Sequence, residues 1–107
     1  MPQQSEHIYK LCPATLWRKA LAAGVFEGSP RDLEDGFIHC STSEQLAETA
    51  RKYFTGYEEL LLLTIDPAQL GDALKFEPSR DGALFPHIYG PLALTAVVNV
   101  TPFDVIE

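Results

Sequence analysis

Cysteine is scarce in this 107-residue sequence, in which Cys12 and Cys40 are the only two cysteines. Two thiols cannot build the disulfide framework that holds small secreted domains together. Their spacing also differs from that of the paired cysteines in a zinc knuckle. We therefore expect a cytoplasmic protein with reduced thiols.

Basic residues and long apolar runs are also scarce. Eight Lys and Arg oppose 15 Asp and Glu, which gives a formal net charge of -7. This balance opposes general binding to nucleic acids or anionic membrane surfaces, where clustered cations supply most of the attraction. The longest apolar run, residues 60–63, is far too short to cross a bilayer. Residues 1–7 lack a basic region followed by an apolar run, so we expect no secretory signal.

The residues that are present suit one small α+β domain spanning residues 1–107. Hydrophobic residues make up 46% of the chain, enough for a single core. Apolar spacing predicts one helix that begins at Pro13 and stops at Gly24, and another from Thr42 to Gly56. Single helical turns are expected at residues 29–32 and after Asp66. Strands are predicted at residues 7–11, 37–41, 60–65, 74–77, 87–89 and 93–100.

The segment Gly-Phe-Ile-His-Cys-Ser-Thr at residues 36–42 is the first candidate for a functional site. Neighbouring side chains of a strand point to opposite faces, so His39 and Ser41 should reach a common pocket. Thr42 and Gln45 match a capping box, which places a helix N-terminus suited to anions beside them. The alternative interpretation is structural: Thr42 only caps the helix, and His39 is a hydrogen-bonded core residue.

A second segment, Phe-Pro-His-Ile-Tyr-Gly-Pro at residues 85–91, has the same character. His87 and Tyr89 share one face of an extended chain, and Gly90 lets the chain bend or lets a ligand approach the backbone. The structural alternative is a bulged strand with a satisfied His ring and Tyr hydroxyl. Glu77 is the nearest carboxylate that could act as a base or orient a ring, and Asp66 fits a helix cap better.

Metal binding and cysteine catalysis fit the pattern poorly. No histidine pair has helix-face spacing, and Cys40 is expected to face away from His39. Zinc sites need three or four converging ligands, so we expect no metal site. The Cys40 thiol should lie on the core side of its strand, where it would be inert as a nucleophile.

These segments together resemble the bacterial family called domain of unknown function 952, and the resemblance covers nearly the whole chain. The family's fold resembles that of ADP-ribosyltransferases and RNA 2'-phosphotransferases, which bind NAD in a cleft between two small sheets. The resemblance implies mixed sheets flanked by two main helices. It rests on Ile-Tyr-Lys at 8–10, Trp17, residues 36–42, Gln45, Phe54, Leu-Leu-Thr-Ile-Asp at 62–66 and Phe-Pro-His-Ile-Tyr-Gly-Pro-Leu at 85–92.

Only some of the functional positions of the transferase fold have a matching residue in this sequence. Ser-Thr-Ser at residues 41–43 matches the element that supports the NAD site in such enzymes. The early strand carries Lys10, with His7 before it, and neither is the usual residue there. The late strand has His87 and Tyr89 and no clear counterpart of the catalytic glutamate. The resemblance thus implies an inherited pocket more than an inherited reaction.

The sequence therefore predicts a cleft like an NAD site that binds a small, anionic, nucleotide-like ligand and acts on it. NAD or a nucleotide fragment is the cofactor type that fits. We expect Glu77 to lie outside this pocket and to leave the histidines without a carboxylate partner. The alternative function is a non-catalytic binding or protein-interaction module, with structural histidines, a solid core behind them and an exposed apolar patch near Trp17. The predicted site consists of the catalytic His39 and His87 and the ligand-binding Ser41, Thr42, Tyr89 and Gly90.

Overall fold

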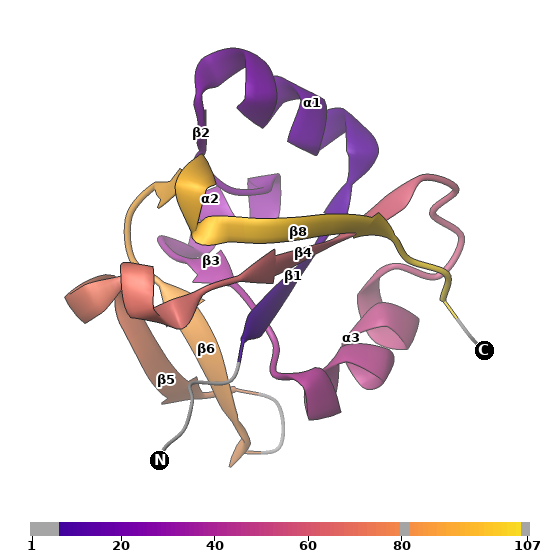
Figure 1. Cartoon of the computed structure of the whole chain (residues 1–107). Coiled ribbons are helices and arrows are strands. Elements are labelled where there is room, and N and C mark those ends of the chain that lie inside the picture. The colour runs from indigo at the N-terminus through magenta and orange to yellow at the C-terminus, as the bar shows by residue number, and fades with distance from the viewer. Residues whose placement is uncertain (1–6, 80–81, 106–107) are drawn as a thin grey trace.

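Three small sheets form the framework of the protein (Figure 1). The computed structural model describes residues 7–79 and 82–105. The first sheet has the order β1-β4-β8, with β1 at Ile8–Pro13, β4 at Leu60–Ile65 and β8 at Val97–Pro102. In the view of Figure 1, helix α1 lies above this sheet and helix α3 below it. The expectation of a single α+β domain is confirmed.

Two further sheets complete the framework. Strand β2 (Val25–Phe26) pairs with β7 (Leu92–Ala93). The third sheet has the order β3-β6-β5, with β3 at Ile38–His39, β6 at Leu84–Ile88 and β5 at Leu74–Pro78. Every strand pairing within the described residues is antiparallel, so the expectation of mixed sheets is wrong there.

The two expected longer helices are present, joined by a shorter one. Helix α1 spans Ala14–Ala23 and ends at Gly24, whose φ of 84° is the left-handed conformation that glycine adopts without strain. Helix α2 covers Pro30–Asp35. The second long helix, α3 (Leu46–Tyr53), begins later than predicted because a 3₁₀ turn at Ser43–Gln45 precedes it.

Short 3₁₀ turns interrupt the second half of the chain. The carboxylate of Asp66 accepts the N–H of Ala68 at 3.1 Å, which confirms this aspartate as the cap of a turn. A further turn divides the strand expected at residues 93–100 into β7 and β8. The turns cover Pro67–Gln69, Gly71–Ala73 and Leu94–Ala96.

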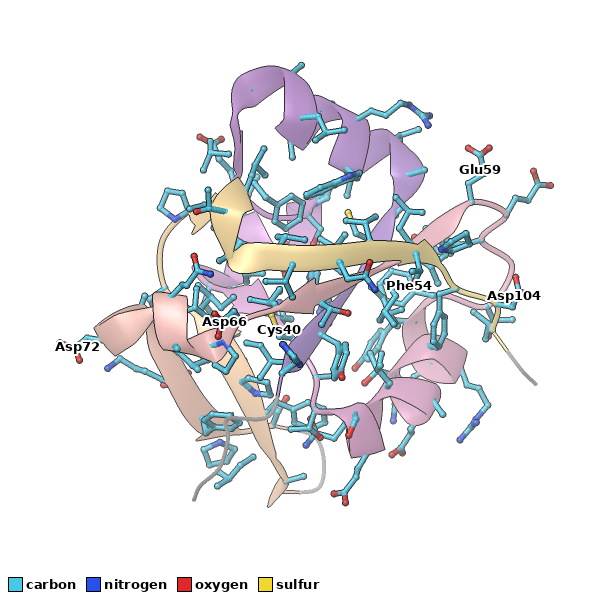
Figure 2. The ribbon with its side chains drawn as sticks, viewed as in Figure 1. Cys40, Phe54, Glu59, Asp66, Asp72 and Asp104 are labelled. Carbon is cyan, nitrogen blue, oxygen red and sulfur yellow. The ribbon has the colours of Figure 1, made fainter. Side chains whose placement is uncertain are left out.

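Two groups of buried apolar side chains form the core. The smaller group lies under α3 and contains Leu11, Leu46, Ala50 and Leu60. The larger group joins all three sheets, and Figure 2 shows one of its members, Cys40, in the middle of the molecule. It consists of Ile8, Cys12, Ala20, Phe26, Ile38, Cys40, Leu63, Ile65, Ile88, Leu92 and Ala96.

The strand expected at residues 37–41 is shorter than predicted, and its end connects two sheets. Cys40 N–H donates to Pro86 O at 3.0 Å, and Ser41 forms an antiparallel bridge with Tyr9 of β1. The side-chain alternation is as predicted, because Ile38 and Cys40 lie in the core whereas Phe37 contacts the ring of His39.

None of the helices in the described ranges is long and apolar enough to cross a membrane. The opening residues, on which the expectation about a secretory signal rests, lie mostly outside the described part of the chain.

Candidate functional site

The two histidines of the predicted site lie side by side. His39 in β3 and His87 in β6 are direct partners in the antiparallel register. Their ring centroids are 5.7 Å apart, with an interplanar angle of 70°. The ring of Phe37 stacks on His87 at 4.0 Å and lies 4.6 Å from His39. The predicted convergence of the two segments is confirmed.

Asp32, the last residue but three of helix α2, anchors His39. Its side chain is 2% exposed, and its Oδ1 accepts both the backbone N–H of His39 at 3.0 Å and a hydrogen bond with Nδ1 of that ring at 2.7 Å. Oδ2 accepts the N–H of Ser29 at 2.8 Å. Burial raises the pKa of Asp32, but the hydrogen bond from His39 and the charge of Lys10 outweigh it and hold the pKa well below its usual range.

Lys10 supplies the balancing positive charge from the middle of β1. It lies in a buried strand between core residues, where an ammonium group needs a partner. Its Nζ lies 2.9 Å from Oδ2 of Asp32 and donates to the carbonyl oxygen of His39 at 2.9 Å. The ion pair therefore connects β1, α2 and β3 at one point.

The second nitrogen of His39 also faces a carboxylate. Nε2 lies 2.9 Å from Oδ2 of Asp35, whose side chain is 41% exposed. Both ring nitrogens of His39 thus have acidic partners, one buried and one at the surface. The expectation that His39 lacks a carboxylate partner is wrong, because α2 brings two aspartates against the end of β3.

Glu77 of β5 is the carboxylate partner of the other histidine. Its Oε1 lies 2.7 Å from Nδ1 of His87 and accepts the hydroxyl of Tyr89 at 2.7 Å. The hydrogen bonds from His87 and Tyr89 lower the pKa of Glu77, and the same contact raises the pKa of Tyr89. The expectation that these two residues lack a carboxylate is wrong, although Glu77 itself does not line the cavity described next.

A cavity of about 320 Å³ opens beside these groups. Its polar part is formed by side chains from β1, α2, β3 and β6, including Lys10, Asp32, His39 and His87. A set of aromatic side chains forms much of the remaining wall. These are Tyr9, Tyr53, Phe54, Tyr57 and Phe85.

The predicted site residues divide between the cavity wall and its surroundings. His39, Ser41 and His87 line the cavity, and the Ser41 hydroxyl donates to Thr49 Oγ1 at 3.2 Å. Thr42 is outside the lining, and its backbone N–H donates to Gln45 Oε1 at 3.0 Å as the capping box predicts.

Tyr89 and Gly90 also lie outside the cavity wall, although Tyr89 reaches the site through Glu77. Gly90 has a φ of 112°, so the bend after β6 favours glycine for its backbone conformation.

The cavity wall reverses the charge balance of the whole chain. Among the residues that the structure describes, its charged side chains are two cations, Lys10 and Arg31, and one carboxylate, Asp32. Figure 2 shows three other acidic residues, Glu59, Asp72 and Asp104, at the outer edge of the molecule. The guanidinium of Arg31 lies 4.5 Å from the ring centroid of Tyr53 at this wall. An excess of cations in a recess of an acidic protein favours an anionic ligand.

Sequence reasoning missed Asp32, its pairing with Lys10, and the aromatic wall. Ser29 and Asp32 form a capping box, and this local role hid the long-range one. A lysine in a buried strand is the only sequence signal that could have indicated a buried anion nearby.

The cysteine thiols take no part in this chemistry, although Cys40 is among the residues that line the cavity. Burial raises the pKa of Cys12 to about 11 and that of Cys40 to about 12, so the thiols are protonated and inert at neutral pH. In the part of the chain that the structure describes, no three His, Cys, Asp or Glu side chains are arranged to hold a metal ion.

Comparison with known proteins identifies relatives of the whole domain. The family model described as protein of unknown function DUF952 matches residues 11–100. The crystal structure of protein CC0527 from Caulobacter crescentus is 46% identical, with a TM-score of 0.90 over 94% of this chain and 89% of that one. The solution NMR structure of CC0527 has a TM-score of 0.83, with 94% and 87% covered. No curated protein matches the sequence.

Proposed function

The chain belongs to the DUF952 family of proteins of unknown function, and we propose that it binds a small, anionic, nucleotide-like ligand in the cavity beside His39 and His87. One observation carries the proposal: the cavity combines an excess of cations with an aromatic wall in an otherwise acidic protein. An aromatic wall suits a planar base, and cations suit the attached phosphate or carboxylate.

The polar groups of the cavity are suited to fixing such a ligand. Arg31 lies in the first turn of α2 and is exposed, so its guanidinium can contact an anion without losing a buried partner. The Ser41 hydroxyl lies deeper, on a residue that is 4% exposed. Recognition by a few polar groups within a mostly apolar wall is typical of small-molecule sites.

The proposal that the protein is an interaction module has less support. That alternative requires a solid core behind the histidines, whereas both histidines line a cavity. The apolar patch that it requires near Trp17 is present only in part: Leu21, one turn along α1, is exposed, but Trp17 itself is half-buried and packs against the main core.

Binding should be detectable as a rise in melting temperature with AMP, ADP or NAD, because a ligand that binds only the folded state stabilises it by mass action. Adenosine, which lacks the anionic group, should give a much smaller rise. Arg31→Ala should weaken AMP binding at least about tenfold, since hydrogen bonds to charged groups contribute about 1.5–3 kcal/mol. Calorimetric titration measures the change.

Arg18→Ala is the matched control, because Arg18 is an exposed helical arginine outside the cavity wall. It should leave the affinity for AMP unchanged. The proposal fails if none of the nucleotides raises the melting temperature, or if the two arginine variants weaken binding equally.

The sequence resemblance implies a transferase-like fold that lacks the usual catalytic glutamate, and this leads to a second expectation, that bound NAD is not cleaved. Transfer of ADP-ribose needs a carboxylate at the reacting sugar, and Glu77 lies outside the cavity wall with its Oε1 engaged by His87 and Tyr89. Incubation with NAD should therefore release no nicotinamide above background, as measured by chromatography. Release that disappears in Glu77→Gln would show instead that the protein is a working transferase or glycohydrolase.

A further inference from the structure

We propose that the two histidines have different protonation states and different roles: His39 is a fixed cation, and His87 is the neutral base that accepts a proton from the ligand. The assignment of roles rests on the proposed ligand site. The assignment of protonation states rests on hydrogen-bond geometry alone and can be tested without any ligand.

His39 has no nitrogen lone pair to offer. An ionised carboxylate only accepts hydrogen bonds, so each ring nitrogen that faces one must carry a proton. Nδ1 faces Asp32 at 2.7 Å and Nε2 faces Asp35 at 2.9 Å. With both contacts made, the ring is an imidazolium. It cannot act as a base, and it adds a positive charge to the cavity wall.

His87 has a single carboxylate partner. Nδ1 faces Oε1 of Glu77 at 2.7 Å, and the same oxygen accepts the Tyr89 hydroxyl, so Nδ1 carries the proton. Within residues 7–79 and 82–105, no hydrogen bond holds Nε2. The two nitrogens of an imidazole point away from each other. Because Glu77 lies outside the cavity wall and His87 lines it, Nε2 is the nitrogen on the cavity side.

The cations beside His87 oppose a second positive charge there, whereas the Glu77 carboxylate favours one. Lys75 of β5 is the register partner of His87 on one side, and the cationic His39 of β3 is its partner on the other. Lys10 and Asp32 pair with each other beyond His39, and within residues 7–79 and 82–105 Glu77 is the acid that contacts His87. Because Nε2 has no partner among the described residues and the His39 ring lies 5.7 Å away, we assign His87 as neutral in the free protein.

Glu77, Tyr89 and Phe37 are positioning residues in this arrangement. Glu77 fixes the tautomer of His87, Tyr89 holds Glu77, and Phe37 stacks on the imidazole ring at 4.0 Å. When a hydroxyl of the ligand or a bound water approaches, its O–H bond breaks, the proton moves to Nε2 and the electron pair stays on oxygen. The Glu77 carboxylate then stabilises the imidazolium that forms.

Nitrogen NMR of protein labelled with ¹⁵N-histidine tests the protonation states at neutral pH. We expect both nitrogens of His39 to be protonated, and His87 to be neutral with its proton on Nδ1. Glu77→Gln should change the spectrum of His87 alone, whereas the matched variant Asp35→Asn should change that of His39 alone. A protonated His87 or a neutral His39 in the unmodified protein overturns the assignment.

Modification by diethyl pyrocarbonate tests the free lone pair on the cavity side. An imidazole nitrogen attacks a carbonyl of the reagent, and ethyl carbonate leaves. Peptide mass spectrometry should find modification at His87 and at the exposed His7. It should find none at His39. Modification of His39 with His87 untouched contradicts the proposal. If no nucleotide binds but this pattern is found, the proposed ligand is wrong while the assignment of the base stands.

Discussion

Replacing Asp32 with asparagine is expected to lower the free energy of unfolding by about 3–5 kcal/mol, the usual cost of removing one partner of a buried ion pair. The Asp32 side chain is 2% exposed and accepts hydrogen bonds from Lys10, His39 and Ser29. Asparagine keeps the shape but leaves the Lys10 ammonium without a counter-charge in a buried strand. Urea unfolding, followed by circular dichroism, measures the loss.

Asp35→Asn is the matched control for this variant. Asp35 also contacts His39, but its side chain is 41% exposed, so its ion pair should contribute about 1 kcal/mol or less. Adding Lys10→Met to Asp32→Asn should recover part of the lost stability, because the unpaired cation is then removed. Equal losses in the two aspartate variants would mean that the Lys10–Asp32 pair does not support the fold.

The meeting of His39 and His87 could be predicted from the sequence because it depends on local patterns. Each histidine lies within a short apolar segment that reads as a strand, and side-chain alternation then decides which face it occupies. Two short strands of one small sheet leave few places for such side chains. The register that makes the histidines direct partners is a further detail that only the structure supplies.

The partners of the histidines could not be predicted, because they depend on long-range packing. Asp32 and Lys10 are 22 positions apart, and nothing local indicates that α2 lies against β1. The error over Glu77 has a similar cause. Glu77 is opposite Phe85 in the register, which puts His87 on the diagonal, within reach of a long side chain. The late strand is predicted to begin at His87, whereas β6 begins at Leu84. The predicted strand therefore lacks Phe85, the residue that pairs with Glu77.

The aromatic wall shows a limit of helical periodicity. Spacing in residues 42–56 predicts that the helix continues to Gly56, with Tyr53 and Phe54 in its buried stripe. Helix α3 instead ends at Tyr53, and this side chain is 37% exposed. Beyond the end of a helix, the helical repeat no longer determines where a side chain points. Phe54 and Tyr57 follow the end of α3, and both line the cavity.

Acid should destabilise the protein through Asp32. The pKa of Asp32 is held below its usual value of 3.8 in the folded state, chiefly by His39 and Lys10 acting against burial. A lowered folded-state pKa contributes stability that is fully present above the unfolded-state value and is lost as pH falls toward the folded-state value. Between about pH 5 and about pH 2, we expect a loss of about 2–3 kcal/mol from this residue, measured by denaturant unfolding across the range.

The control for this loss is the slope of stability against pH in Asp32→Asn, which should be shallower over the same range because asparagine does not titrate. The pKa of Glu77 is also lowered, by the hydrogen bonds from His87 and Tyr89, so a smaller loss of the same sign should persist in that variant. The Asp32 carboxyl can also be followed directly by ¹³C NMR in the unmodified protein. A carboxyl resonance that titrates near 3.8 would contradict the prediction, because an aspartate with that pKa in the folded state gains nothing from its partners when the protein folds.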